Sequence, residues 1–87
     1  MDEELGPREM AVLDFERSWW QHSGPKDETV REVLGMSATR YYQILMRLLD
    51  DPRALAYDPL VVRRLLKLRN RRRAQRVLAR LPATPEA

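Results

Sequence analysis

Apolar residues recur at helical intervals in this sequence. Val12, Phe15 and Trp19 follow one another at the i, i+3, i+7 spacing of one α-helical face. No segment shows the strict alternation of apolar and polar residues that marks a half-buried β-strand. We therefore expect an all-α fold, and the 87 residues are enough for one small domain with a modest core.

Glycines, prolines and capping residues set the ends of the expected helices. Pro7 suits a first helical turn, and Gly24, which precedes a proline, ends that helix. Asp27 and Ser37 can cap the next two helices, and each of the two later Asp-Pro steps can begin another. The expected helices cover about residues 7–22, 28–34, 38–49, 52–56 and 59–80.

Two adjacent tryptophans, Trp19 and Trp20, lie near the end of the first expected helix. Small domains rely on large aromatic side chains for buried area, so we expect both in the core. The alternative is that this helix forms a homodimer interface.

The composition excludes several classes of protein. With no cysteine and one histidine, we expect no disulfide, no metal site and no cofactor. The three glycines form no phosphate-binding loop and no nucleophile has a base beside it, so we expect no enzyme. No apolar run approaches the ~20 residues of a membrane span, and the acidic N-terminus is not a secretory signal. We expect a cytoplasmic, nucleoid-associated protein that binds no membrane.

The stretch 34–45 has the layout of a helix-turn-helix. Gly35 permits a left-handed turn between two helices, Met36 adds an apolar residue to the core, and Ser37 caps the second helix. In DNA-binding proteins with this layout, the second helix lies in the major groove. The same pattern also occurs in ordinary helix bundles, where the outward face is merely solvated.

A helical wheel separates the two tyrosines of the second helix. Tyr41 falls on the core stripe, and Tyr42 lies about 100° away, on the flank. Thr39 and Gln43 point outward, where a methyl group can touch thymine and an amide can read an adenine edge. Arg40 and Arg47 flank this outward face on the side opposite Tyr42 and can hold phosphates or guanines.

Charge is segregated along the chain. Residues 1–52 carry six basic and eleven acidic side chains, whereas residues 53–87 carry ten basic and two acidic ones. A basic C-terminal part indicates an acidic partner, and nucleic acid is the commonest. The alternative is a solvated charged helix end.

The last expected helix has two apolar stripes. The first begins at Val61, and the second, from Ala74 onwards, lies on nearly the opposite side. Because one straight helix cannot bury both on one surface, we expect the first half to dock and the second half to project. The second half then pairs with another chain or follows a break near Asn70. The expected phosphate contacts are the basic side chains Lys26, Arg40, Arg47, Arg63, Arg64, Arg71, Arg72 and Arg73.

Several stretches resemble known families. "GPREMAVLDFE…ETVREVLGMSATRYYQILMRLL" resembles the DNA-binding end of bacterial sigma factors and the output domains of response regulators. "LDFERSWW", "MSATRYYQ" and "LAYDPLVVRRL" more closely resemble a family of small actinobacterial helix-turn-helix-like proteins of unknown function. This resemblance spans about residues 12 to 73 and implies a DNA-binding regulator. One departure is Arg31, which stands where the first helix usually has a small residue at the helix crossing. By motif position, the base-reading roles fall on Ser37, Ala38, Thr39, Tyr42, Gln43 and Met46.

These inferences give four segments and one leading function. We expect a disordered acidic N-terminus (1–6), a helix-turn-helix domain (7–57), a basic helix (58–81) and a tail (82–87). The expected function is a transcriptional regulator that binds double-stranded DNA, as a homodimer through the tryptophan helix or the distal C-terminal helix. The alternative is a protein-interaction module that contacts RNA polymerase, a sigma factor or another regulator through its aromatic first helix.

Overall fold

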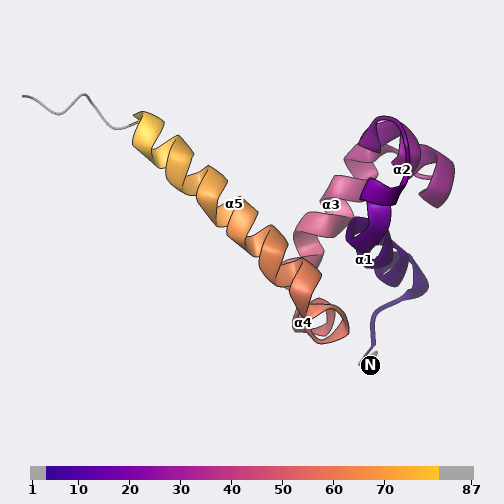
Figure 1. The fold of residues 1–87 in the computed structure, drawn as a ribbon. Coiled ribbons are helices and arrows are strands. Elements are labelled where there is room, and N and C mark those ends of the chain that lie inside the picture. The colour runs from indigo at the N-terminus through magenta and orange to yellow at the C-terminus, as the bar shows by residue number, and fades with distance from the viewer. Residues whose placement is uncertain (1–3, 81–87) are drawn as a thin grey trace, which may run out of the picture.

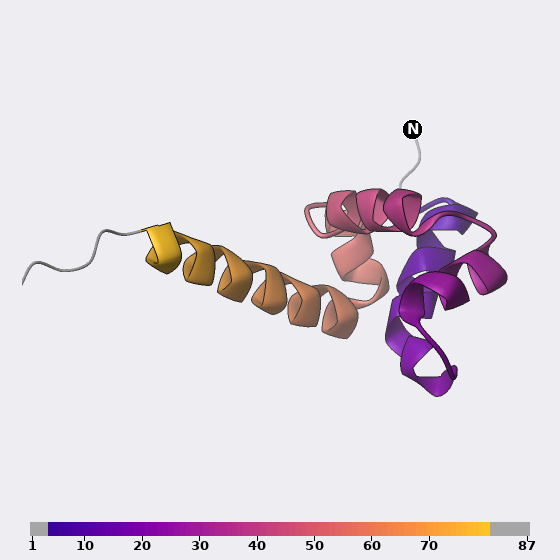
Figure 2. The same ribbon diagram turned by 90° about the horizontal axis from the view of Figure 1, so that it is seen from above.

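The structure, a computed structural model, describes residues 4–80 (Figure 1). This part of the chain is all-α, as expected, and contains no strand. Helices α1 to α4 form one body, and α5 leaves it as a long projection (Figure 1, Figure 2). The elements are α1 (Pro7–Ser18), the 3-10 turn η1 (Trp19–Gln21), α2 (Lys26–Leu34), α3 (Ala38–Leu48), α4 (Pro52–Tyr57) and α5 (Pro59–Arg80).

Side-chain caps begin the last three helices. Ser37 Oγ accepts a backbone N–H of the first turn of α3 at 3.1 Å, as expected. The carboxylates of Asp51 and Asp58 do the same for α4 and α5, at 2.9 Å and 3.2 Å. A proline follows each of these aspartates at the first helical position, where its missing N–H costs nothing.

Gly35 makes the turn between α2 and α3. Its φ of +66° is in the left-handed region, as expected, and its N–H donates to the Arg31 carbonyl at 3.0 Å. The Arg31 side chain is exposed, whereas the buried residues of α2 are Thr29 and Val30. The arginine at the expected crossing position therefore keeps its charge in solvent.

Two expected helix ends are wrong. The first α-helix ends at Ser18, and one 3-10 turn replaces its expected last residues. The second begins at Lys26, so Asp27 lies inside its first turn and does not cap it. Pro25 occupies the cap position, and its carbonyl accepts both the N–H (3.1 Å) and the hydroxyl (2.9 Å) of Thr29. At its actual position, Asp27 interacts favourably with the positive end of the helix dipole.

The core lies between α1 and α3, which pack closely, and the start of α5 closes it from one side. Tyr41 is fully buried, as the wheel predicts, and its ring meets Phe15 edge to face at 5.6 Å. Its hydroxyl donates to the carboxylate of Glu16, another buried residue of α1. Burial, followed by this carboxylate, raises the pKa of the Tyr41 hydroxyl far above its usual range.

The structure corrects one expectation about buried residues. Trp20 is 65% exposed, because the 3-10 turn directs it outward, where its indole N–H donates to the Arg17 carbonyl at 3.1 Å. Trp19 is half-buried against the core, as expected. Leu5 lies in the segment 1–6 that was expected to be disordered, and its apolar side chain is buried in the core, where it gains from leaving water. Residues 1–3 of that segment lie outside the described residues.

Helix α5 is continuous, and no break occurs near Asn70. Val61 and Val62 are buried, Leu65 is half-buried, and every residue from 71 to 80 is exposed. We call residues 71–80 the projecting segment. The expected helix range of 59–80 matches α5. Residue 81, the last of the expected basic segment, and the expected tail at 82–87 lie outside the described part of the chain.

Candidate nucleic-acid interface

The expected base-reading residues lie on the first two turns of α3 and its exposed side. Thr39 and Gln43 are exposed, and Met46 (43%) and Tyr42 (38%) are partly so. Their shared face is polar at its centre and apolar along one edge. Ala38 is half-buried and the Ser37 hydroxyl is used in capping, so these two are the least available members of the set.

Lys26, expected to contact phosphate, serves another role. Its Nζ lies 2.9 Å from Glu16 Oε2 and over the rings of Trp19, Tyr41 and Tyr42, at 5.0, 5.7 and 5.6 Å from their centroids. Only 21% of its side chain is exposed. The ammonium therefore neutralises a buried carboxylate and joins α2 to α1 and α3.

Tyr42 links this cluster to the outward face of α3. Its ring meets that of Tyr41 edge to face at 5.1 Å, so part of the side chain is held by the core. Burial, with the nearby Asp27 carboxylate as the next cause, raises the pKa of the Tyr42 hydroxyl. The hydroxyl therefore stays protonated at neutral pH and can donate a hydrogen bond to a ligand.

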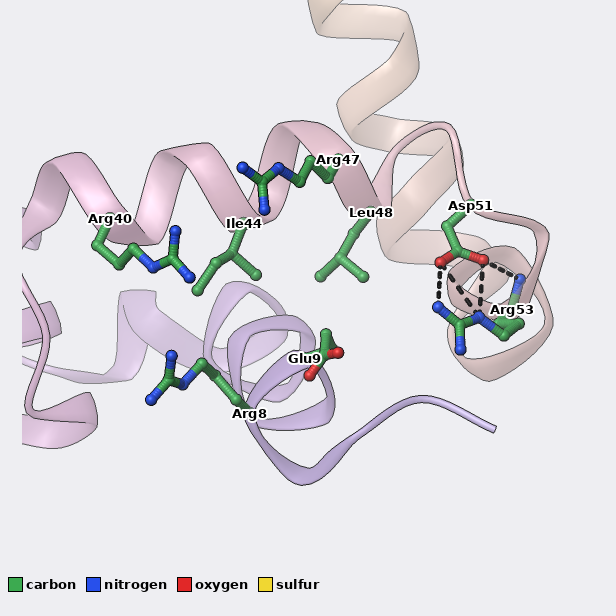
Figure 3. Close-up of a pocket in the computed structure, with 8 residues that line it drawn as sticks. All are labelled: Arg8, Glu9, Arg40, Ile44, Arg47, Leu48, Asp51 and Arg53. Carbon is green, nitrogen blue, oxygen red and sulfur yellow. Dashed lines mark hydrogen bonds and ion pairs between the residues drawn. The ribbon is translucent and has the colours of Figure 1, made fainter. Parts of the chain in front are cut away.

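A hollow of about 430 Å³ lies between α1 and α3, on one side of the exposed face of α3 (Figure 3). Arg40 and Arg47 of α3 and Arg8 of α1 line it, above an apolar base that includes Ile44. The carboxylates of Glu9 and Asp51 line the same hollow. Within residues 4–80, no carboxylate pairs with any of these three guanidinium groups. We call Arg8, Arg40 and Arg47 the arginine cleft.

Sequence reasoning missed Arg8, although a signal for it was present. Arg8 lies in the first turn of α1, and Arg40 lies in the first turn of α3. A cation at the positive end of a helix dipole is unfavourable, so two such arginines facing one hollow indicate a purpose other than helix stability. Their convergence from distant parts of the sequence could be seen only in the folded chain.

Of the α5 arginines expected to contact phosphate, one is hydrogen-bonded to the helical body and the others are exposed. Arg64 donates to the Glu16 carbonyl at 3.2 Å, so part of its guanidinium is engaged with the body. Arg63, Arg71, Arg72 and Arg73 are exposed and have no ion pair within residues 4–80. The structure does not bring Arg72 together with the arginine cleft, because Arg72 lines a different hollow that includes none of the three cleft residues.

Arg69, which the sequence did not single out, fixes α5 to the end of α3. Its guanidinium pairs with Asp50 at 3.0 Å, and this contact lowers the pKa of the Asp50 carboxyl. The pair joins residues 19 positions apart. It therefore helps to set the direction in which the projecting segment leaves the body.

Within residues 4–80, no three or more metal-ligating side chains are grouped so that they could hold a metal ion. No helix in the same range is long and apolar enough to cross a membrane.

The fold and the exposed basic surfaces define a small all-α protein with a cationic helix projecting from a four-helix body. A family model described as "Protein of unknown function (DUF3263)" matches residues 4–77, so the chain belongs to this family. No curated protein and no solved structure gives a significant match.

Proposed function

We propose that this protein is a transcriptional regulator that binds double-stranded DNA through a helix-turn-helix formed by α2, the Gly35 turn and α3. In this proposal α3 enters the major groove, where Gln43 and Thr39 contact base edges. We also propose that the chain is similar to the DNA-binding domains of sigma factors and response regulators and to small actinobacterial helix-turn-helix-like proteins.

One observation carries the proposal: arginines without acidic partners flank the exposed face of α3 on both sides. The arginine cleft lies on one side, and Arg72 and Arg76 of α5 lie on the other. Like charges held together raise the free energy of a fold unless a polyanion neutralises them. A duplex supplies phosphates on both edges of the groove that α3 would occupy, so it fits this arrangement.

The test is a binding titration of the full chain against random-sequence duplexes at several salt concentrations. Affinity should fall by about 0.9 log units per contacted phosphate for each tenfold rise in salt. Arg8→Ala and Arg47→Ala should each lower the affinity and reduce this slope by about one contact. Arg31→Ala is the matched control, because Arg31 is exposed on α2 and lines neither side of α3.

Base reading by α3 requires a separate measurement. Selection of preferred sequences from the random pool should give a defined site for the wild type and a relaxed one for Gln43→Ala. Absence of duplex binding, or a loss in Arg31→Ala equal to that in the cleft variants, would reject the proposal. An unchanged sequence preference in Gln43→Ala would reject base reading by this residue alone.

The exposure of Trp20 favours the second candidate, a protein-interaction module. A tryptophan with 65% of its surface in water, on the helix expected to make the contact, is the type of residue that anchors interfaces. Under this candidate, Trp20→Ala should abolish capture of RNA polymerase or a sigma factor while DNA affinity stays at the wild-type value.

A further inference from the structure

A second hollow, of about 380 Å³, lies between α3 and α5. Helix α5 passes the end of α3 at the Arg69–Asp50 pair and then diverges from it (Figure 1). Side chains of both helices line the hollow. Leu45 and Leu49 lie at its base. We call this hollow the α3–α5 groove.

The walls of the α3–α5 groove are apolar and partly open to solvent. Tyr42 and Met46 come from α3, and Leu68, 40% exposed, faces them from α5. Three large apolar side chains at one hollow form a surface that gains free energy when it leaves water. Their occupant must therefore bring apolar side chains of its own.

The rim of the groove is basic. Arg72 and Arg76 lie one turn apart on α5, both are exposed, and neither forms an ion pair within residues 4–80. Arg69 lies one turn earlier, and its Nε is buried without a hydrogen-bond acceptor in the described part of the chain. An occupant with carboxylates along one edge would pair with Arg72 and Arg76, whereas the Arg69 guanidinium already pairs with Asp50.

Two other occupants fit less well. A second copy of α5 offers Val77 and Leu78, but it brings the arginines of its own projecting segment toward the basic rim. Glu4, an acidic residue near the chain's N-terminus, lies elsewhere, because its carbonyl accepts from Arg53 of α4 at 3.3 Å. A phosphodiester strand matches the rim, but its phosphates gain nothing from the apolar walls.

From these contacts we infer that the α3–α5 groove binds an acidic amphipathic helix of a partner protein. The apolar stripe of that helix packs against Tyr42, Met46 and Leu68, and its carboxylates pair with Arg72 and Arg76. Recognition of this kind, in which a helix lays its apolar face into a groove, needs anchors at i, i+3, i+4 and i+7 spacing. The inference concerns a different partner from the DNA contact of α3, on a surface that overlaps that contact.

The groove and the proposed DNA contact share four residues, because Arg72 and Arg76 of the rim also flank the DNA face. Tyr42 and Met46 line the groove and also belong to the face of α3 proposed to read bases. An acidic helix in the groove would cover these side chains and place negative charge beside the DNA path. The partner and a duplex therefore exclude each other, so the groove provides a means of releasing the protein from DNA. This competition, unlike peptide binding itself, rests on the proposed function.

The test uses the full chain and three labelled synthetic peptides that differ in one property each. The first is a helical peptide with leucines at i, i+3, i+4 and i+7 spacing and glutamates elsewhere. The second replaces the glutamates by lysines, and the third replaces the leucines by glutamines. We expect only the first to bind in an anisotropy titration, with NMR shifts concentrated on Tyr42, Met46 and Leu68.

Matched charge reversals locate the contact on α5. Arg72→Glu/Arg76→Glu should lower the affinity for the first peptide by about tenfold or more. Lys67→Glu/Arg71→Glu has the same charge change and spacing on residues that do not line the groove, so it should retain the wild-type affinity. Leu68→Ser should also weaken binding, with the helix content checked by circular dichroism.

Each contrary outcome identifies a different error. Equal losses in the two charge-reversal pairs, or equal binding of the glutamine peptide, would show unspecific attraction and overturn the inference. Self-association of the chain that Leu68→Ser abolishes would assign the groove to a second copy. Duplex binding that moves the Leu68 signal, without binding of any peptide, would assign it to DNA. If the first peptide binds and no duplex does, the inference stands and the proposed function fails.

Discussion

Replacing Lys26 by methionine tests whether the ammonium is structural. The substitution keeps most of the side-chain volume but leaves the Glu16 carboxylate, only 4% exposed, without its 2.9 Å partner. Removing one member of a buried ion pair costs about 3–5 kcal/mol. Because Lys26 is 21% exposed and Tyr41 still donates to Glu16, we expect the low end, about 3 kcal/mol.

A loss of this size is a large share of the stability of a small domain, which is about 5–15 kcal/mol. Urea unfolding followed by circular dichroism at 222 nm should show the midpoint falling while the slope with denaturant stays constant. Circular dichroism is preferred to fluorescence because Lys26 lies over the Trp19 ring. Lys67→Met is the control, because this lysine is exposed and has no ion pair within residues 4–80.

A double variant separates the charge effect from packing. Glu16→Gln/Lys26→Met removes both charges, so it should recover much of the stability lost in the single variant. If the free energy of unfolding of Lys26→Met is within about 0.5 kcal/mol of the wild-type value, the buried ion pair is not what holds α2 against α1. A double variant no more stable than the single one would show that contacts of the lysine stem, rather than its charge, dominate.

Three further predictions follow from single residues. Gly35→Ala should cost about 1 kcal/mol in urea unfolding through backbone strain alone, since a Cβ there meets nothing within 4 Å; an unchanged midpoint would contradict the left-handed turn. Tyr41→Ala should lower the melting temperature strongly, whereas Tyr42→Ala should weaken ligand binding and lower the melting temperature less. A larger fall in melting temperature for Tyr42→Ala than for Tyr41→Ala would refute the assignment of Tyr41 to the core. Hydrogen bonds from Arg53 lower the pKa of Asp51, so its stabilising contribution is present above about pH 4 and is lost as pH falls through the lowered value. Asp51→Asn should therefore show a shallower loss of thermal stability between neutral pH and pH 2.

The parts of the fold that could be predicted depend on local chemistry. Gly35 and Ser37 act through their own backbone and their nearest neighbours along the chain, so a one-dimensional pattern contains the information. Tyr41 could be placed because a helical wheel relates it to apolar residues on the same helix. These signals placed α3 to within one residue at its C-terminal end.

The parts that could not be predicted depend on contacts between helices. Trp20 is apolar and adjacent to a core residue, but a change from α to 3-10 geometry rotated it outward. Lys26 looked like a surface cation, although its partner Glu16 lies ten positions earlier on another helix. Arg8 and Arg47 line one hollow from two different helices, so no spacing rule connects them.

The continuity of α5 means that one helix is stabilised in two different ways. Near Val62, opening a backbone hydrogen bond also exposes buried core residues to water. This opening therefore requires nearly the free energy of global unfolding. In the projecting segment no tertiary contact covers the backbone, and helices this short are marginal on their own in water. Amide exchange along α5 should therefore accelerate progressively toward Arg80. A partner that slows exchange at particular residues of the projecting segment would reveal where on that segment the partner is bound.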